Sequence, residues 1–232
     1  MTSSPDHPVQ LLLAVDTSGK NGSIALARVS PSNTAQLIET IPLTGGTFSA
    51  ELVPQIASLL EKHSFTKDDL AGFAVVSGPG SFTGLRVGLA AIKGLAEALR
   101  KPIAAISLLE VIARNGKIEG RLCAALDAGR NEVYVGDYEV SAEIRTFSER
   151  LLQREDFLAE AKHALVVTPD PALADSARQA GCRVQEIEYP QAGVIARIGW
   201  ERIRRGEIVR PEDLEANYIR RSDAEIFSKP RT

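Results

Sequence analysis

A glycine-rich segment that precedes an apolar stretch has the residue types of a phosphate-binding loop. It reads SGPGSFTGLRVGLAAIKGLAEAL and spans residues 77–99. Its first glycines allow the backbone to approach a ligand closely. The backbone N–H groups and the dipole of a following helix favour an anion at such a place. The candidate nucleotide-binding residues of this loop are Gly78, Pro79, Gly80 and Ser81.

The spacing of this loop matches neither of the two common nucleotide loops. A P-loop ends in Gly-Lys followed by Ser or Thr, whereas here Gly84 is followed by Leu85 and Arg86. A dinucleotide-binding loop reads G-x-G-x-x-G and is followed by an acidic residue after the next strand. The glycines here read G-x-G-x-x-x-G, and the next apolar run, residues 102–107, ends without that acid. Both nucleotide interpretations are therefore weak.

Two aspartates follow apolar runs in similar segments, Asp16 in LLLAVD and Asp127 in CAALD. Around Mg²⁺–ATP such a pair would support a phosphotransferase. The segment VDTSG is close to the Asp-Thr-Gly loop of aspartic proteases, but Ser18 stands where that loop has glycine. Two interpretations of Asp16 remain open: a carboxylate that faces phosphate or metal, and a turn residue that bonds its own backbone. The candidate nucleotide-binding residues here are Asp16, Thr17 and Ser18.

The stretch up to about residue 99 predicts a helix that is apolar on two sides. One face carries Leu85, Leu89, Ile92, Leu95, Ala96 and Leu99, and a second carries Val87, Ala91, Gly94 and Ala98. A helix of this kind must be buried on two sides. One side can pack on its own sheet. The other needs a second helix, either the predicted helix 50–63 of this chain or a helix of a partner, and both interpretations remain open.

Composition and charge narrow the functional classes. The 232 residues are 44% hydrophobic and 25% charged, with a net charge of -3, which is a poor balance for holding nucleic acid unaided. The three histidines lie far apart, so a histidine-based metal site is not expected. The two cysteines lie in or beside apolar runs and are expected to be reduced. The apolar run near the N-terminus is too short for a membrane span, and we expect a cytoplasmic protein.

The pattern of apolar runs predicts an α/β fold with an internal duplication. Residues 9–30 predict two strands around a turn, and residues 121–140 repeat strand, aspartate, turn and strand. Further strands are expected at residues 36–43, 71–78, 102–107 and 164–170. Two late helices are each closed by a glycine, and the tail, residues 214–227, could pair as a strand. We expect two subdomains, residues 1–106 and 107–232, with a tail that packs back on the first.

The chain resembles the TsaB (YeaZ) family. The resemblance rests on LLLAVDTSGKNGSIAL, VVSGPGSFTGLRVGLAAIKGLA and ALDAGRNEVYVGDYE, and more weakly on EANYIRRSDAE. It implies an ASKHA (actin/Hsp70-like) fold of two RNase-H-like halves, with mixed sheets of the five-stranded type flanked by helices. It also implies a non-catalytic scaffold subunit in the synthesis of N6-threonylcarbamoyladenosine in tRNA, which heterodimerises with a TsaD-type transferase.

The resemblance further implies a TsaE-type ATPase as partner, tRNA bound through the complex, ATP or ADP at the complex interface, and a homodimer when the chain is alone. A TsaD-type subunit carries a His-x-x-x-His metal motif after the strand that corresponds to residues 102–107, whereas residues 107–113 contain no histidine. The resemblance therefore implies no metal and no catalytic residue. Phe48 stands near a place where family members often have histidine. The alternative functions are a stand-alone ASKHA phosphotransferase or ATPase and a glycoprotease-like peptidase.

The resemblance places the partner interface on the predicted helices 50–63 and 83–99. The residues expected to form it are Leu52, Ile56, Leu59, Leu85, Arg86, Gly88, Leu89, Ile92, Leu95 and Ala96.

Overall fold

The structure, a computed structural model, describes residues 9–30 and 33–220. The chain divides into two compact units. Unit 1 comprises Met1–Val76, Thr83–Ala105 and Gln191–Glu215, and unit 2 comprises Ser77–Phe82, Ile106–Pro190 and Ala216–Thr232. The chain first enters unit 2 at Ser77–Phe82, returns to unit 1 at Thr83 and passes into unit 2 again after Ala105, whereas we expected a single boundary after residue 106. The return of residues 191–215 to unit 1 makes both units discontinuous in sequence.

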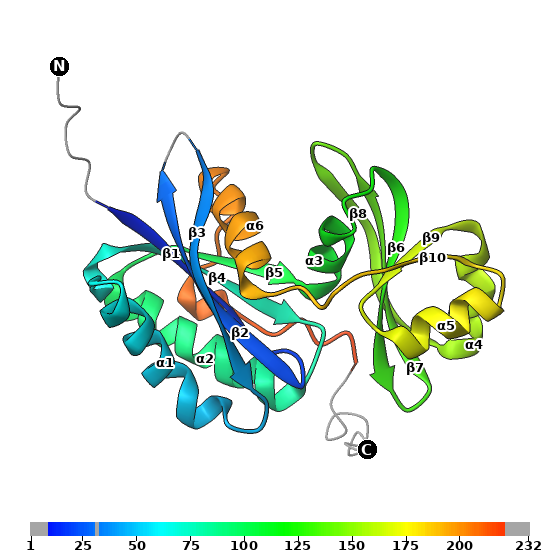
Figure 1. The fold of residues 1–232 in the computed structure, drawn as a ribbon, viewed down its shortest axis with the longest axis horizontal. Coiled ribbons are helices and arrows are strands. Elements are labelled where there is room, and N and C mark those ends of the chain that lie inside the picture. Colours follow the sequence, from blue (N-terminus) through cyan, green and yellow to red (C-terminus); the bar gives the residue numbers. More distant parts are fainter. Residues whose placement is uncertain (1–8, 31–32, 221–232) are drawn as a thin grey trace, which may run out of the picture. The chain divides into compact units, whose positions relative to one another are not determined.

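Unit 1 is built on a mixed five-stranded sheet in the order β3-β2-β1-β4-β5 (Figure 1). Strand β1 pairs antiparallel with β2 and parallel with β4. The apolar run of β1 is buried throughout after its first residue, as expected for a central strand that is covered on both faces. The strands are β1 (Gln10–Asp16), β2 (Asn21–Ser30), β3 (Asn33–Thr44), β4 (Leu70–Gly78) and β5 (Ile103–Ser107).

Neighbouring residues of β2 show that helices cover both faces of this sheet. A Cβ at Gly22 would meet the ring of Phe48, the first residue of α1. The next residue, Ser23, accepts a hydrogen bond from the N–H of Ala192, the first residue of α6, at 2.9 Å. Successive residues of a strand point to opposite faces, so α1 and α6 lie on opposite sides. The helices are α1 (Phe48–Lys62), α2 (Phe82–Leu99) and α6 (Ala192–Arg204), with short 3-10 helices at Lys67–Asp69 and Pro211–Asp213.

Unit 2 repeats the topology of unit 1. Its sheet order, β10-β9-β6-β7-β8, is that of unit 1 read from the other edge, and its first two strands also form an antiparallel hairpin. The internal duplication predicted from the two aspartate hairpins is therefore confirmed. The strands are β6 (Gly120–Gly129), β7 (Glu132–Val140), β8 (Ile144–Gln153), β9 (Leu165–Thr168) and β10 (Arg183–Glu186). The helices are α3 (Leu108–Asn115), α4 (Arg154–Glu160) and α5 (Pro171–Gln179), with a 3-10 helix at Ala161–His163.

The helix that follows the last strand of each unit belongs to the other unit. Helix α3 follows β5 but packs on β6–β9, and α6 follows β10 but packs on β1–β3. In unit 1 the indole N–H of Trp200 on α6 donates to the carbonyl of Ser30 at 3.1 Å, which anchors the helix to β2. The apolar face of α6 thus explains why residues 191–215 return to unit 1.

The later part of the chain contains elements that the apolar pattern did not predict. These are α3, β8, α4 and β10. They are short or, as in β8, have largely half-exposed side chains, so they carry little periodic signal. Residues 214–220 of the predicted tail strand lie in no strand of the structure, and residues 221–227 lie outside the described residues.

Candidate functional site

The inner faces of α1 and α2 form part of the core of unit 1. Eight of the ten residues that we expected at a partner interface are buried: Leu52, Ile56, Leu59, Leu85, Gly88, Leu89, Ile92 and Ala96. Leu95 is half-buried and Arg86 is exposed. The buried side chains stabilise unit 1 itself. A partner would therefore contact these helices through other side chains.

The opposite sides of α1 and α2 are exposed and carry small or apolar residues. We call this surface the outer face. Val53 on α1 is 55% exposed, a large value for an apolar side chain within a helix. The helical spacing of the other members, three or four residues apart, keeps them on one side of each helix. The outer face comprises the exposed Val53, Pro54 and Ala57 on α1, and on α2 the exposed Ala90, Gly94 and Ala98 with the half-buried Val87 and Ala91. The exposed Arg86 and Glu97 lie on the same side of α2, four residues before Ala90 and three after Gly94.

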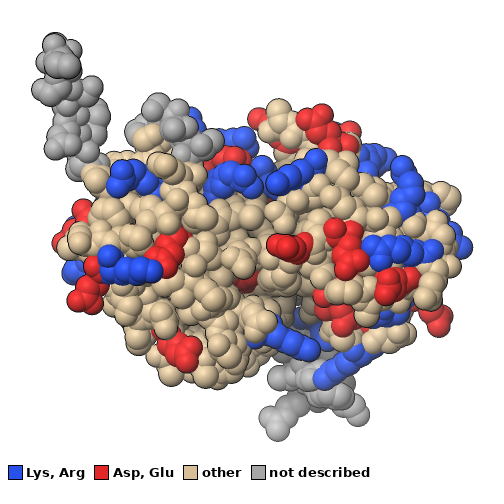
Figure 2. Space-filling model, viewed as in Figure 1, with Lys and Arg blue, Asp and Glu red and all other residues tan. Residues whose placement is uncertain are grey.

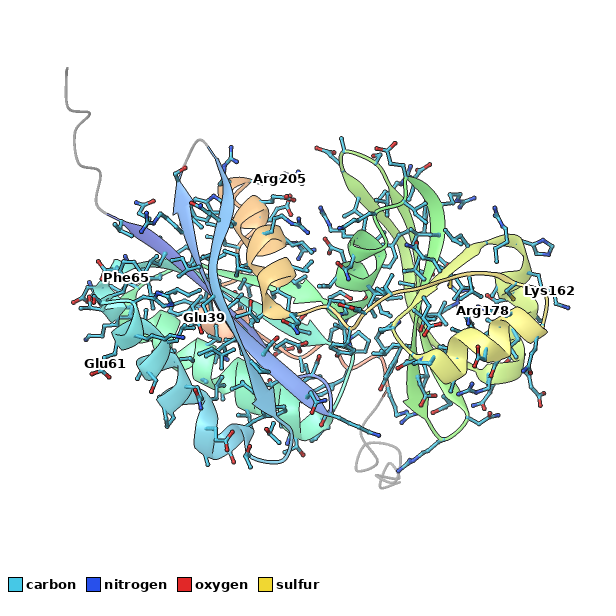
Figure 3. The ribbon with its side chains drawn as sticks, in the orientation of Figure 1. Glu39, Glu61, Phe65, Lys162, Arg178 and Arg205 are labelled. Atoms are coloured by element: carbon cyan, nitrogen blue, oxygen red, sulfur yellow. The ribbon has the colours of Figure 1, made fainter. Side chains whose placement is uncertain are left out.

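Charged side chains are sparse over this part of unit 1. In the lower left of Figure 2, over α1, most of the surface is neither acidic nor basic. Glu61, labelled in Figure 3, projects from the C-terminal part of α1 beyond the outer face. An exposed apolar area with charges at its rim is typical of a surface that binds another protein.

Two glycines of α2 show that one side of this helix packs closely within unit 1 and the other side does not. A Cβ at Gly88 would lie 2.3 Å from the hydroxyl oxygen of Thr17, so Gly88 allows α2 to pack closely on the end of β1. A Cβ at Gly94 would meet nothing within 4 Å. Gly94 lowers helix stability without a packing role in unit 1, and it leaves the outer face flat for a close neighbour.

The chain's own tail packs against both ends of the glycine loop. The N–H of Asn217 donates to the carbonyl of Ser77 at 2.7 Å, and a Cβ at Gly78 would lie 2.6 Å from the carbonyl oxygen of Asn217. Phe82 stacks on Tyr218, with ring centroids 4.9 Å apart. The close backbone approach predicted at Gly78 is therefore observed within unit 2, and the approaching group is a peptide. Gly78 and Pro79 are buried, Gly80 is half-buried and Ser81 is exposed.

The tail has further anchors in unit 2. Asn217 donates through its side-chain amide to Glu149 at 3.0 Å, and Glu149 also accepts from the hydroxyl of Tyr138. Arg220 forms an ion pair with Glu132 and lies over the ring of Tyr134. Sequence analysis missed this role, because the polar anchors in EANYIR are isolated residues without periodicity. The local signal available was Asn217 directly before the aromatic Tyr218.

The Asp16–Ser18 turn is buried in unit 1. Oδ1 of Asp16 accepts hydrogen bonds from the backbone N–H of Ser18 at 2.8 Å and from its hydroxyl at 2.5 Å. Thr17 donates to the carbonyl of Gly84 at 2.7 Å. Of the two interpretations of Asp16, the structure shows the turn residue that bonds its own backbone. These bonds fasten the end of β1 to the start of α2, and a role in nucleotide binding stays a prediction.

Burial raises the pKa of Asp16, and the two hydrogen bonds from Ser18 oppose that shift. The other carboxylate oxygen, Oδ2, is buried and has no hydrogen-bond partner among the described residues. A buried carboxylate that is only half satisfied is energetically unfavourable in its charged form. Asp127, its counterpart in unit 2, is 45% exposed and pairs with Arg154 at 2.9 Å.

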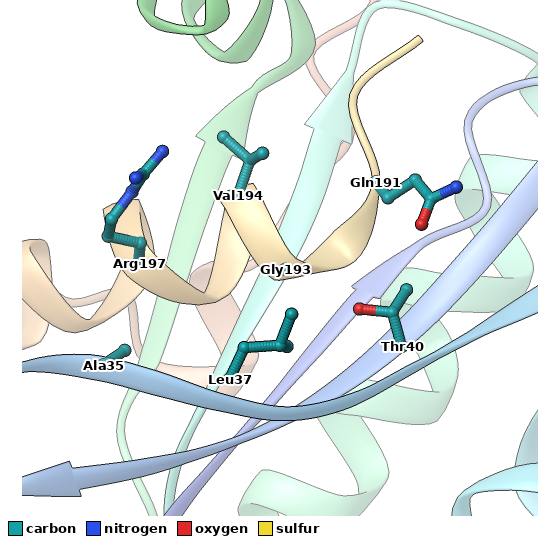
Figure 4. Close-up of a pocket in the computed structure, with 7 residues that line it drawn as sticks. All are labelled: Ala35, Leu37, Thr40, Gln191, Gly193, Val194 and Arg197. Carbon is teal, nitrogen blue, oxygen red and sulfur yellow. The ribbon is translucent and has the colours of Figure 1, made fainter. Parts of the chain in front are cut away.

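A shallow groove in unit 1 lies between β3 and α6 (Figure 4). Its volume is about 330 Å³, and its floor includes Leu37, which is 51% exposed. Arg197 and Gln191 lie at its two ends. None of the predicted site residues lines it.

Within residues 9–30 and 33–220, no three His, Cys, Asp or Glu side chains are grouped so that they could hold a metal ion. None of the helices in the described part of the chain combines the length and the apolar character needed to cross a membrane.

Comparisons with known proteins agree with this fold. The family model described as TsaD, tRNA N6-adenosine threonylcarbamoyltransferase, matches residues 42–195. The tRNA threonylcarbamoyladenosine biosynthesis protein TsaB of Bacillus subtilis is 37% identical over 55% of this chain and 55% of its own length. The chain thus matches about half the length of that relative. An uncharacterised protein of Mycobacterium tuberculosis is 28% identical over 93% of this chain and 94% of its own length.

The solved structure titled YeaZ from Pseudomonas aeruginosa has a TM-score of 0.71 and 25% identity, and the match covers 91% of this chain and 100% of that one. The two mixed sheets, their flanking helices and the duplicated topology are those of the ASKHA-like α/β fold. On this evidence, the chain belongs to the TsaB/YeaZ family, within the wider family that the TsaD model describes.

Proposed function

We propose that this chain acts in the biosynthesis of N6-threonylcarbamoyladenosine in tRNA, as the scaffold subunit that binds a TsaD-type transferase through its outer face. Two of the relatives' names support the pathway: TsaB of Bacillus subtilis is named a tRNA threonylcarbamoyladenosine biosynthesis protein, and the matching model is named for the transferase. The observation that carries the proposal is the exposed, largely apolar surface of α1 and α2, on which Val53 is 55% exposed.

The proposed role is non-catalytic, and three features of the chain support it. The tail of the same chain contacts both ends of the glycine loop that resembles a phosphate site. Asp16, which would face a phosphate or a metal in an ASKHA enzyme, is buried in a turn with Thr17 and Ser18. The segment 107–113, in which the resemblance implies a metal motif for the transferase, has no histidine. The absence of a metal and of catalytic residues stays a prediction.

The proposal includes the remaining partners. A TsaE-type ATPase would join the heterodimer, tRNA would bind to the complex, and ATP or ADP would bind at the complex interface. The whole assembly would be cytoplasmic. Without its transferase partner the chain would form a homodimer through the same outer face, because an exposed apolar area of this kind favours self-association.

Replacing each of two exposed alanines with glutamate tests the interface. Ala90 is exposed on the outer face of α2, and Ala172 is exposed on α5, the helix at the equivalent place in unit 2. Ala90→Glu would bury a charge against the partner, and we expect a loss of affinity of about a hundredfold or more. Ala172→Glu should bind as the wild type does. Isothermal titration calorimetry measures the affinity of each variant for the TsaD-type protein. Equal affinities of the two variants would refute the outer face as the interface.

A leave-one-out reconstitution tests the function. The chain is mixed with TsaC-, TsaD- and TsaE-type proteins, ATP, threonine, bicarbonate and unmodified tRNA, and the modified nucleoside is quantified by mass spectrometry with and without this chain. We expect no modification without it and no ATP hydrolysis by the chain alone. Full modification in its absence would overturn the scaffold proposal. Hydrolysis or phosphoryl transfer by the chain alone would favour the stand-alone ASKHA enzyme.

A further inference from the structure

Two arginines of unit 2 lie against one exposed aromatic ring. The guanidinium carbon of Arg121 is 4.7 Å from the ring centroid of Phe147, and that of Arg145 is 5.1 Å from it. Phe147 is 42% exposed, and both arginines are exposed. The cluster therefore presents two cationic planes and one aromatic plane to solvent.

The geometry of three neighbouring strands builds this cluster. Arg121 on β6 is directly opposite Glu139 on β7, which is directly opposite Arg145 on β8, so these three side chains share one face of the sheet. The pairing of β7 with β8 shifts by one residue between Asp137 and Tyr138, and the residue left over on β8 is Phe147. A β-bulge redirects a side chain, and here the side chain turns onto the guanidinium groups. The arrangement is held by backbone pairing and is preformed.

The two arginines of the cluster form no ion pair within the described part of the chain, although Glu139 lies in the row between them. Neither Arg121 nor Arg145 forms an ion pair there, and the carboxylate of Glu139 lies within ion-pair distance of neither. Other arginines of the unit differ: Arg150 and Arg154 hold the carboxylates of Asp137 and Asp127. Two like charges beside one ring favour an anion between or above them.

The ligand must combine negative charge with a flat surface. RNA has both, because its phosphates pair with guanidinium groups and its unpaired bases stack on aromatic rings and on arginine planes. An acidic protein segment supplies the charge but rarely a second flat group. We infer that the Arg121–Phe147–Arg145 cluster is a contact site for the RNA substrate, so that unit 2 touches tRNA directly. The inference rests on the proposed function for the identity of the RNA.

The net charge of the chain limits how strongly the cluster can bind RNA. The chain has a net charge of -3, and Glu139 lies within the row that bears both arginines. The cluster therefore adds to the tRNA affinity of the complex and does not supply all of it. Figure 2 shows basic side chains interspersed with acidic ones over the visible face of unit 2.

Substitutions at the cluster test the inference on the full-length chain bound to its TsaD-type partner. Binding of fluorescein-labelled, unmodified tRNA is followed by fluorescence anisotropy at several salt concentrations. Phe147→Leu keeps an apolar side chain but removes the aromatic plane, and we expect affinity to fall about fivefold to tenfold. In the double variant Arg121→Gln/Arg145→Gln we expect a loss of about tenfold, and a slope of log affinity against log salt that is shallower by about 1 to 2.

Arg197→Gln is the matched control, because Arg197 is an exposed arginine of unit 1 outside the cluster, and its tRNA affinity should stay within about twofold of the wild type. Circular dichroism and thermal unfolding confirm that each variant is folded. Wild-type affinity in the cluster variants, or no measurable binding of tRNA by the wild-type complex, would overturn the inference. So would loss of a protein partner with unchanged tRNA affinity, which would identify the cluster as a site for an acidic protein.

The reconstitution keeps this inference separate from the proposed function. If the wild-type chain is required for modification but the cluster variants bind tRNA and support modification fully, the proposed function stands and the RNA site is refuted. If modification does not need the chain, the proposed function fails. The tRNA affinity of the chain alone, compared between wild type and Phe147→Leu, then decides the RNA site independently.

Discussion

The pairs of helices that connect equivalent strands in the two units have very different outer surfaces. Helices α1 and α2 of unit 1 are 15 and 18 residues long and expose small or apolar residues. Helices α4 and α5 of unit 2 are 7 and 9 residues long and carry ion pairs, among them Arg150 with Glu160 and Arg178 with Glu186. In Figure 3, Lys162 lies at the outer edge of unit 2. The same topology thus bears one surface suited to a protein partner and one suited to water.

The two hairpins repeat this contrast on a smaller scale. Asp16 and Asp127 occupy matching places near the ends of β1 and β6. Asp16 is buried and bonds Ser18, whereas Asp127 is partly exposed and bonds Arg154. In unit 1 the long helix α2 begins over the turn, since Thr17 bonds Gly84. The length and packing of the connecting helices therefore place the two equivalent aspartates in different environments, one buried and one partly exposed.

The largest expected effect separates the inner side of α2 from its outer side. Ile92 is 0% exposed in the core of unit 1. We expect Ile92→Ala to lower the free energy of unfolding by about 2–5 kcal/mol, because it leaves a cavity. Ala90→Glu on the outer side should change it by no more than about 0.5 kcal/mol. Urea denaturation followed by circular dichroism measures both, and equal losses would erase the distinction between the two sides.

Two glycines of α2 allow a finer test with the same substitution. Gly88→Ala would press a methyl group against Thr17, and we expect a loss of about 1–3 kcal/mol in the free energy of unfolding. Gly94→Ala meets open space, so it should stabilise the protein by about 0.5–1 kcal/mol through helix propensity. Thermal unfolding of both variants gives the sign of each change. A stabilising Gly88→Ala would mean that α2 is not packed on Thr17.

The paired aspartates predict opposite effects of the same change. Asp16→Asn keeps the acceptor for Ser18 and removes a buried charge. We therefore expect the free energy of unfolding to increase by about 1 kcal/mol at neutral pH, and Tm to rise by about 2–4 °C. Asp127→Asn removes a partly exposed ion pair, and we expect the free energy of unfolding to fall by at most about 0.5–1 kcal/mol.

The pH dependence gives the sign of the Asp16 effect. Because the pKa of Asp16 is raised in the folded protein, its carboxyl binds the proton more tightly there than in the unfolded chain. Stability from this group is therefore highest below the unfolded pKa and falls as pH rises toward the folded pKa. Thermal unfolding of wild type and Asp16→Asn across pH 3.5–8 should show a difference that grows with pH. A difference in Tm between the two proteins that stays constant with pH would contradict the ionisation of a buried Asp16.

The smallest expected effect is on the charged surface of unit 2. Arg178 on α5 pairs with Asp175 and Glu186, and all three side chains are well exposed. We expect Arg178→Gln to leave both Tm and affinity for the TsaD-type protein unchanged within error, since exposed pairs contribute little. A marked loss of partner affinity would mean that the second helix pair is also an interface, and the contrast between the units would fail.

Several features could be predicted from the sequence because their signals are local. The apolar runs of β1 and β4, the helical spacing of α2 and the repeated strand–aspartate–turn pattern depend on neighbouring residues alone. The fold class and the duplication followed from them. Elements such as β8 and α4 were missed, since half-exposed side chains without strict alternation give no periodic signal.

The candidate site was only partly predictable. The residues expected at a partner interface from the apolar pattern are mostly buried in unit 1, because the largest apolar side chains of a helix are usually those it buries within its own unit. The proposed partner surface consists of smaller residues such as Ala90 and Gly94. The helical spacing placed Gly94 on a second face of the predicted helix, but only the structure shows that Gly94 is exposed. The Arg121–Phe147–Arg145 cluster was also invisible, since its members come from two strands that are adjacent only through β7.

By itself the sequence determined the family, the duplicated α/β topology and the presence of a helix that is apolar on two sides, since motif, periodicity and repeat are properties of contiguous residues. Only the tertiary structure decided which side of that helix is free, what packs against the glycine loop and where unpaired charges meet an exposed ring. Each of these depends on contacts between segments far apart in the chain, such as Asn217 with Ser77 and Thr17 with Gly84. Burial and charge pairing are properties of such contacts, and no local pattern of residue types encodes them.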